Sequence, residues 1–177
     1  MYNMYKDLVE VIGTGKVVGF FGDKNFPNKS QGKSIKDKTE AFNRLRMLLG
    51  ALRPKKIYVC PELGLSNALL SLFLMLDIPY SVVNPYRGYF DNIPTKDKLR
   101  MFIGLENSSS VITMSDNKPK SVMEQQTLFE ESQEFLVESS ELIITAFGNN
   151  PHIGVLKTTD KLMAMDGKPV IALSYAT

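Results

Sequence analysis

The segment PNKSQGKS at residues 27–34 carries residue types that bind nucleotide phosphates. Its last three residues match the end of the P-loop motif G-x-x-x-x-G-K-[ST], in which backbone N–H groups and a lysine surround the phosphates. Pro27 stands where the first glycine belongs, and proline lacks an N–H group and cannot adopt a positive φ. The apolar run that would form the preceding strand ends near Gly22, well before Lys33. We therefore interpret the segment as a polar loop in which Ser34 caps the following helix.

A better candidate for phosphate binding is CPELGLSN at residues 60–67, where a β-rich run leads through a short turn into a helix. Gly64 would let the backbone approach a phosphate, and Ser66 and Asn67 fall in the first helical turn, where N–H groups lack partners. Glu62 is a candidate for binding a pair of ribose hydroxyl groups. The alternative is purely structural, with Gly64 forming the turn and Ser66 capping the helix.

The segment NPYRGYF at residues 84–90 follows another β-rich run and offers groups for a nucleobase. Two tyrosines and a phenylalanine could stack on a base, and an arginine could bind phosphate or stack on the same ring. We expect this segment to lie close to the point where the strand order reverses. The alternative is a packed surface loop. Its candidate ligand-binding residues are Asn84, Tyr86 and Arg87.

Short β-rich runs and longer amphipathic stretches alternate along the chain, and these segments lie between them. The predicted strands are 17–22, 56–60, 79–83, 110–115, 141–147 and 169–174, and the predicted helices are 38–52, 65–77, 95–107, 121–140 and 154–166. Such alternation predicts an α/β fold: a Rossmann-like, open and mostly parallel sheet with helices on both faces. Ligands bind such sheets beyond the carboxyl ends of the strands. The remaining candidates after strands are Gly22, Lys24, Gly148, Asn149, Gly154, Lys157 and Thr158.

The length and composition of the chain limit the class of protein and its partners. A chain of 177 residues with 44% hydrophobic residues fits one globular domain, 1–177, with its core at about 16–174. A net charge of +2 argues against a nucleic-acid partner. No apolar run has the length of a membrane span, and no signal peptide is recognisable. Cys60 is the only cysteine, which indicates a cytoplasmic protein. His152 is the only histidine, so we expect no metal site, and we expect no cofactor and a homo-oligomer.

Three segments resemble the SLOG superfamily of Rossmann-like proteins, which is named for its DprA-like and lonely-guy members, and in particular its YpsA-like branch. They are GFFGDKNF (19–26), CPELGLSN (60–67) and SSELIITAFGNNPHIGVLKTTDKLMAMDGKPVIAL (139–173). The chain departs from the branch at Cys60-Pro61, where Ser-Gly is usual, and at Gly154-Val155, where a double glycine is usual. It also lacks the P-G-G-x-G-T-x-x-E signature of the lonely-guy enzymes.

The resemblance implies that the chain binds a nucleotide or a nucleotide-derived small molecule, similar to ADP-ribose. Such a domain would sense, carry or sequester the molecule, for a cell or for an infecting phage. An alternative of another class is an enzyme that cleaves or transfers an N-glycosidic bond, with Glu62 as its catalytic carboxylate. A third is a DprA-like accessory protein of nucleic-acid processing.

Overall fold

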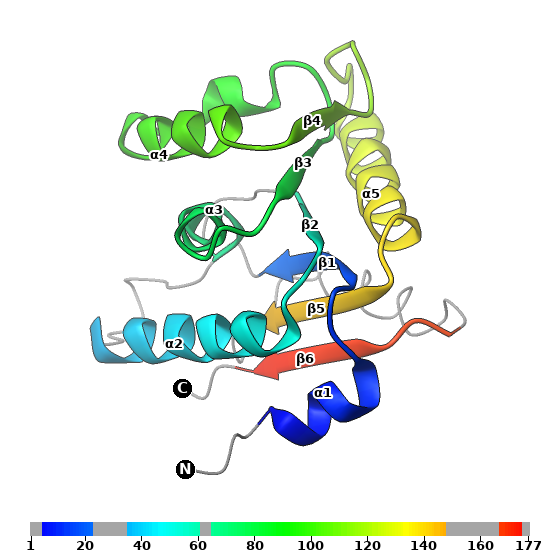
Figure 1. Ribbon diagram of the computed structural model, residues 1–177. Coiled ribbons are helices and arrows are strands. Elements are labelled where there is room, and N and C mark those ends of the chain that lie inside the picture. The colour runs from blue at the N-terminus through cyan, green and yellow to red at the C-terminus, as the bar shows by residue number, and fades with distance from the viewer. Residues whose placement is uncertain (1–4, 23–34, 61–64, 148–166, 175–177) are drawn as a thin grey trace.

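The computed structural model describes residues 5–22, 35–60, 65–147 and 167–174, and these residues contain one open sheet (Figure 1). Its strands are β1 (Val17–Gly22), β2 (Lys56–Val59), β3 (Tyr80–Asn84), β4 (Ser110–Thr113), β5 (Leu142–Phe147) and β6 (Val170–Ser174). The strand order is β4-β3-β2-β1-β5-β6, and each neighbouring pair is parallel. The predicted Rossmann-like α/β fold is therefore confirmed, with a sheet that is wholly parallel.

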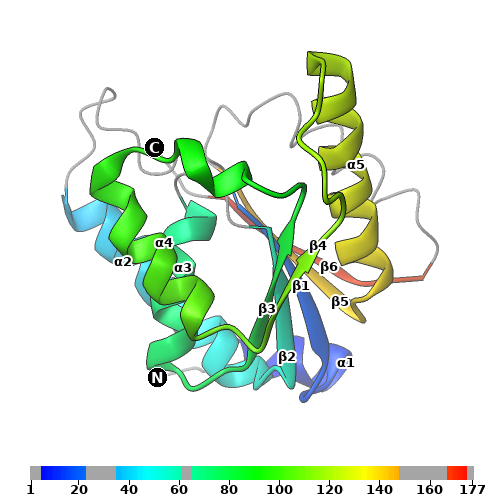
Figure 2. The same ribbon diagram turned by 90° about the horizontal axis from the view of Figure 1, so that it is seen from above.

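Helices cover both faces of the sheet (Figure 2). They are α1 (Lys6–Ile12), α2 (Ile35–Leu52), α3 (Leu65–Met75), α4 (Thr95–Glu106) and α5 (Val122–Glu138), together with the 3-10 helix η2 (Tyr89–Asn92). Helices α2, α3 and α4 lie on one side and α5 lies on the other. The sequence did not predict α1, which is too short for a periodic pattern and packs beside α2. The predicted helix 154–166 lies outside the described residues. No described helix combines the length and the apolar character needed to cross a membrane.

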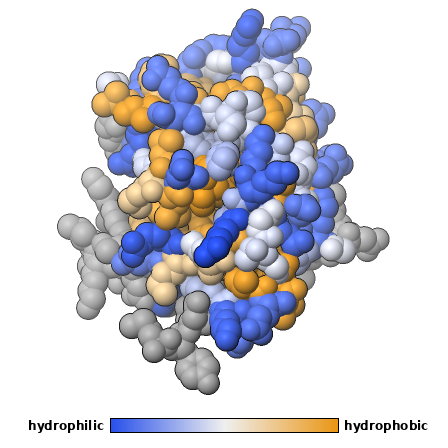
Figure 3. All heavy atoms as spheres, in the orientation of Figure 1, coloured by the Kyte–Doolittle hydropathy of each residue, from blue (hydrophilic) through white to orange (hydrophobic). Residues whose placement is uncertain are grey.

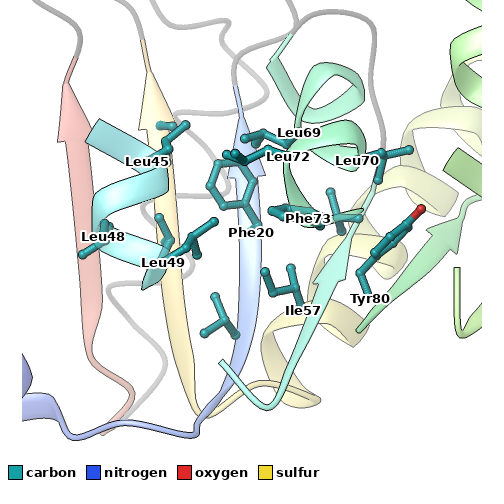
Figure 4. Close-up of a cluster of buried hydrophobic side chains, with 14 of the residues drawn as sticks. Phe20, Leu45, Leu48, Leu49, Ile57, Leu69, Leu70, Leu72, Phe73 and Tyr80 are labelled. Atoms are coloured by element: carbon teal, nitrogen blue, oxygen red, sulfur yellow. The ribbon is translucent and has the colours of Figure 1, made fainter. Parts of the chain in front are cut away.

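The larger core lies between the sheet and the side covered by α2, α3 and α4 (Figure 4). Because side chains alternate along a strand, Val18 and Phe20 of β1 point to this side and Gly19 and Phe21 point to the other. Leucines at helical spacing in α2 and α3 pack around Phe20 of β1 and Phe73 of α3. The two rings meet edge-to-face, with their centroids 6.2 Å apart. This apolar layer holds the starts of α2 and α3 near the carboxyl ends of the strands.

Both ends of α5 are capped, and the cap at its carboxyl end joins the helix to the segment before β6. At its start, Ser121 accepts a hydrogen bond from the Glu124 backbone N–H at 3.1 Å, an ordinary N-cap. At its end, the Lys168 ammonium donates to the Val137 carbonyl at 2.7 Å and to the Glu138 carbonyl at 3.0 Å. A cation is favoured at this end because the last carbonyls of a helix lack partners. Lys168, which lies in the GKPVI segment just before β6, thus caps the carboxyl end of α5.

Tyr80 ties β3 to α4, because its buried hydroxyl donates a hydrogen bond to the Gly104 carbonyl. We expect Tyr80→Phe to lower the free energy of unfolding at pH 7 by about 1 kcal/mol, the usual net contribution of one hydrogen bond. The measurement is urea unfolding followed by circular dichroism. Tyr58→Phe is the control, since the Tyr58 hydroxyl has no hydrogen bond among the described residues; an equal loss in both variants would contradict the prediction.

The same variant should change the stability at alkaline pH. Burial raises the pKa of the Tyr80 phenol above its ordinary value. The folded state therefore binds this proton more tightly than the unfolded state does. The resulting contribution to the free energy of unfolding is fully present below about pH 10, the unfolded-state pKa, and is lost as the pH rises through the folded-state pKa. The alkaline decline in unfolding free energy should be shallower in Tyr80→Phe than in the wild type.

Candidate functional site

The carboxyl ends of the strands form the edge of the sheet at which ligands bind in folds of this kind. From β1 the chain builds β2, β3 and β4 in one direction, then crosses to the other side of β1 to form β5. The strand order therefore reverses between β1 and β5. Register pairs Phe20 with Val59 and Val59 with Val82, so Gly22 and Asn84, each two residues further on, end at the same height.

The segment NPYRGYF does not lie at the reversal of strand order, and that expectation is wrong. It follows β3, which is separated from β1 by β2. The alternation of strands and helices predicts parallel strands but leaves their lateral order open, because that order depends on which apolar faces pack together. The segment instead covers the carboxyl end of β3, next to the end of β4.

Asn84 is the last residue of β3 and is 7% exposed. Its amide Nδ2 donates a long hydrogen bond of 3.4 Å to Thr113 Oγ1 in β4, and its Oδ1 has no hydrogen-bond partner among the described residues. A 180° flip of the amide would let Oδ1 accept a hydrogen bond from the Thr113 hydroxyl, since a hydroxyl both donates and accepts. It would then leave Nδ2 without a partner among the described residues. A buried polar atom without a partner costs about 1–3 kcal/mol. Asn84, one of the sequence candidates, thus carries an oxygen at the carboxyl edge of the sheet to which no described residue donates a hydrogen bond.

Thr145 in β5 is a second buried residue whose side-chain oxygen has no hydrogen-bond partner in the described part of the chain. It pairs with Phe21 of β1 and therefore borders the reversal of strand order. Because side chains alternate, it faces the α5 side, whereas Asn84 faces the side of α3 and α4. Sequence reasoning missed Thr145, since a threonine within ELIITAF is an ordinary β-strand residue.

The aromatic residues after β3 pack on one another. The ring of Tyr89 meets those of Tyr86, Phe90 and Phe129 edge-to-face, with centroids 5.5, 5.1 and 5.3 Å apart. The Tyr86 hydroxyl accepts a hydrogen bond of 3.4 Å from Gln125 of α5. The alternative of a packed surface loop therefore holds for Tyr89, which is the centre of a cluster between η2 and α5. Tyr86 is half-buried at its margin, so stacking on a ligand stays a prediction for Tyr86.

Arg87 is exposed, and its backbone N–H donates to the Ser115 carbonyl at 2.9 Å. This bond joins the segment after β3 to the segment after β4. A second link is the ion pair between Lys118 and Asp91, with 3.4 Å between Nζ and Oδ2. Gly88, between the tyrosines, has φ +83°, a conformation that favours glycine, and a Cβ there would lie 2.5 Å from the Lys118 side chain. Arg87 is thus held at its backbone while its guanidinium faces solvent.

Several sequence candidates are not described by the structure. Gly22 is the last residue of β1, and Ser66 and Asn67 lie in the first turn of α3, where their side chains are not described. The candidates outside the described residues are Lys24, Glu62, Gly64, Gly148, Asn149, Gly154, Lys157 and Thr158, as are His152 and the segment 27–34. Within the described residues, no cluster of three histidine, cysteine or acidic side chains could hold a metal ion.

No protein-family model matches the sequence, and no curated protein matches it significantly. The relationship that is established is therefore one of fold: a Rossmann-like parallel α/β sheet with strand order 4-3-2-1-5-6. The resemblance to the SLOG superfamily remains a hypothesis that rests on three segments, all of which fall partly outside the described residues.

Proposed function

We propose that the protein binds a nucleotide or a nucleotide-derived small molecule of the ADP-ribose type at the carboxyl edge of its sheet, as a sensor, carrier or sequestering protein. The observation that carries the proposal is the buried Asn84 amide, whose Oδ1 accepts no hydrogen bond from any described residue. An amide oxygen accepts hydrogen bonds from ribose hydroxyl groups and from exocyclic amines of bases. A ligand that donates to Asn84 would remove the cost of leaving this oxygen unsatisfied.

The arrangement around Asn84 suits an elongated anionic ligand. Strand β2 is the neighbour of β3, and α3 begins at Leu65, shortly after β2 ends at Val59. The N-terminus of α3 therefore adjoins Asn84 along the edge, and helix N-termini attract phosphate through unpaired N–H groups and the helix dipole. The base or ribose would lie against Asn84 and Tyr86, and the phosphates would lie toward α3.

The direct test is incubation of the protein with a panel of nucleotides, ADP-ribose among them. Protein and bound ligand are separated from free ligand by gel filtration, and the ligand is then analysed by chromatography. Retention of intact ligand supports binding. Release of a free base would replace this proposal by the N-glycosidic enzyme, for which Glu62 is the candidate carboxylate. Retention of no member of the panel would overturn both.

Asn84→Leu should weaken the binding of the retained nucleotide by about tenfold, because the ligand donor loses its acceptor. The melting temperature of the empty protein should stay the same or rise, since the substitution removes a buried unsatisfied oxygen. Titration calorimetry and thermal unfolding provide the two measurements.

Thr145→Val is the matched control. It also removes a buried polar atom that has no partner within the described ranges, but on the side of the sheet covered by α5. It should raise or preserve stability and leave the affinity unchanged. Equal affinity of Asn84→Leu and the wild type would remove Asn84 from the site.

A further inference from the structure

A groove at the surface is lined by residues of α2, α3 and α4. Its volume is about 540 Å³, which is within the range of small-molecule sites. Its apolar lining comes from Phe42 of α2 and from Leu72 and Met75 of α3. Leu72 is buried in the core, whereas Met75 is 69% exposed. Hydrophobic residues are visible at the surface over α3 and α4 (Figure 3).

Two arginines from different helices also line the groove: Arg46 of α2 and Arg100 of α4. Both are exposed, and neither forms an ion pair with another of the described residues. A guanidinium group binds carboxylate, sulfonate and phosphate groups through paired N–H donors. Asn43 of α2 and Ser71 of α3 are the other lining residues, so the groove combines three apolar side chains with two neutral polar ones and two guanidinium groups.

We propose that this groove binds an amphipathic anion, an organic molecule with an apolar body and one carboxylate, sulfonate or phosphate group. The apolar body would cover Met75 and Phe42, and burial of apolar surface provides the larger part of the affinity. The anionic group would lie between Arg46 and Arg100. The flexible thioether of Met75 can adapt to bodies of different shape.

The residues of the lining argue against three other kinds of ligand. A neutral apolar molecule would leave both guanidinium groups without a counter-charge. A cationic amphiphile would be repelled by them. Inorganic phosphate lacks the apolar body, and pairing of an ion with exposed arginines alone contributes little affinity because water screens it. The class of ligand therefore follows from the combination of the two features.

The probe for the test is 8-anilinonaphthalene-1-sulfonate, an aromatic sulfonate whose fluorescence rises in an apolar site. We expect saturable binding to the folded protein. Arg46→Gln and Arg100→Gln should each raise the Kd by about fivefold, a typical contribution of one charge-assisted hydrogen bond at an exposed position. Lys55→Gln removes one positive charge elsewhere on the surface and should leave the Kd unchanged.

Competition separates this site from the nucleotide site. Dodecanoate should displace the probe, whereas dodecanol, inorganic phosphate and ADP-ribose should not at equal concentration. If the arginine variants, with thermal unfolding unchanged, bind the probe like the wild type, the proposal is wrong. Displacement by ADP-ribose would also overturn it, because the groove would then be part of the nucleotide site. Failure of nucleotide binding at the sheet edge has no bearing on either result.

Discussion

Gly19→Ala should lower the free energy of unfolding by about 1–3 kcal/mol, the usual cost of inserting a methyl group into a packed core. Gly19 of β1 lies beneath α5, and a Cβ atom there would be 2.6 Å from both Leu136 Cδ2 and Ser140 Oγ. Both neighbours are buried, at 0% and 3% exposure, so neither can move into solvent. The Ser140 hydroxyl also donates to the Leu136 carbonyl at 2.6 Å, which fixes it further. We expect a melting temperature lower by roughly 3–10 °C.

Gly50→Ala makes the same chemical change in the interior of α2. A Cβ atom at Gly50 meets nothing within 4 Å, and the residue is exposed. Alanine favours the helix over glycine by about 0.5–1 kcal/mol, so this variant should be more stable than the wild type. Opposite signs for the two variants in denaturant unfolding would confirm that contact with α5 accounts for the effect at Gly19. A loss of stability in both would show that it does not.

Tyr86→Ala should weaken nucleotide binding by about tenfold to a hundredfold, the range that stacking of one base implies. Its effect on the empty protein should be small, because among the described residues Tyr86 has one ring neighbour, Tyr89, and one long hydrogen bond, to Gln125. Calorimetric titration gives the affinity, and thermal unfolding with and without ligand gives the stability. Tyr86→Phe keeps the ring and should bind like the wild type.

Tyr89→Ala is the contrasting variant. Tyr89 contacts three rings, and the loss of these contacts should lower the free energy of unfolding by about 2–4 kcal/mol. If Tyr86→Ala melts earlier when empty yet binds nucleotide normally, Tyr86 belongs to the packed cluster and the stacking prediction fails. The two variants thus separate a ligand-binding ring from a structural one within a single segment.

The sequence predicted several residues of the candidate site but not the contacts between them. Asn84, Tyr86 and Arg87 were identified because they follow a predicted strand, and the structure places all three at the carboxyl end of β3. The burial of Asn84 with an unused oxygen was not predictable, since it depends on the distance to Thr113 in a strand almost thirty residues away. The oligomeric state and the roles of Glu62 and Gly64 stay predictions.

The sequence by itself determined the fold class. Strands buried on both faces of a parallel sheet must be apolar along their length, and helices that cover them must be apolar on one side, so both leave a local periodic signature. Only the tertiary structure decided the order β4-β3-β2-β1-β5-β6, the partners of Tyr89, and the meeting of Arg46 and Arg100 at one groove. Each of these depends on packing between residues far apart in the chain, and such contacts leave no periodic pattern in the segments that make them.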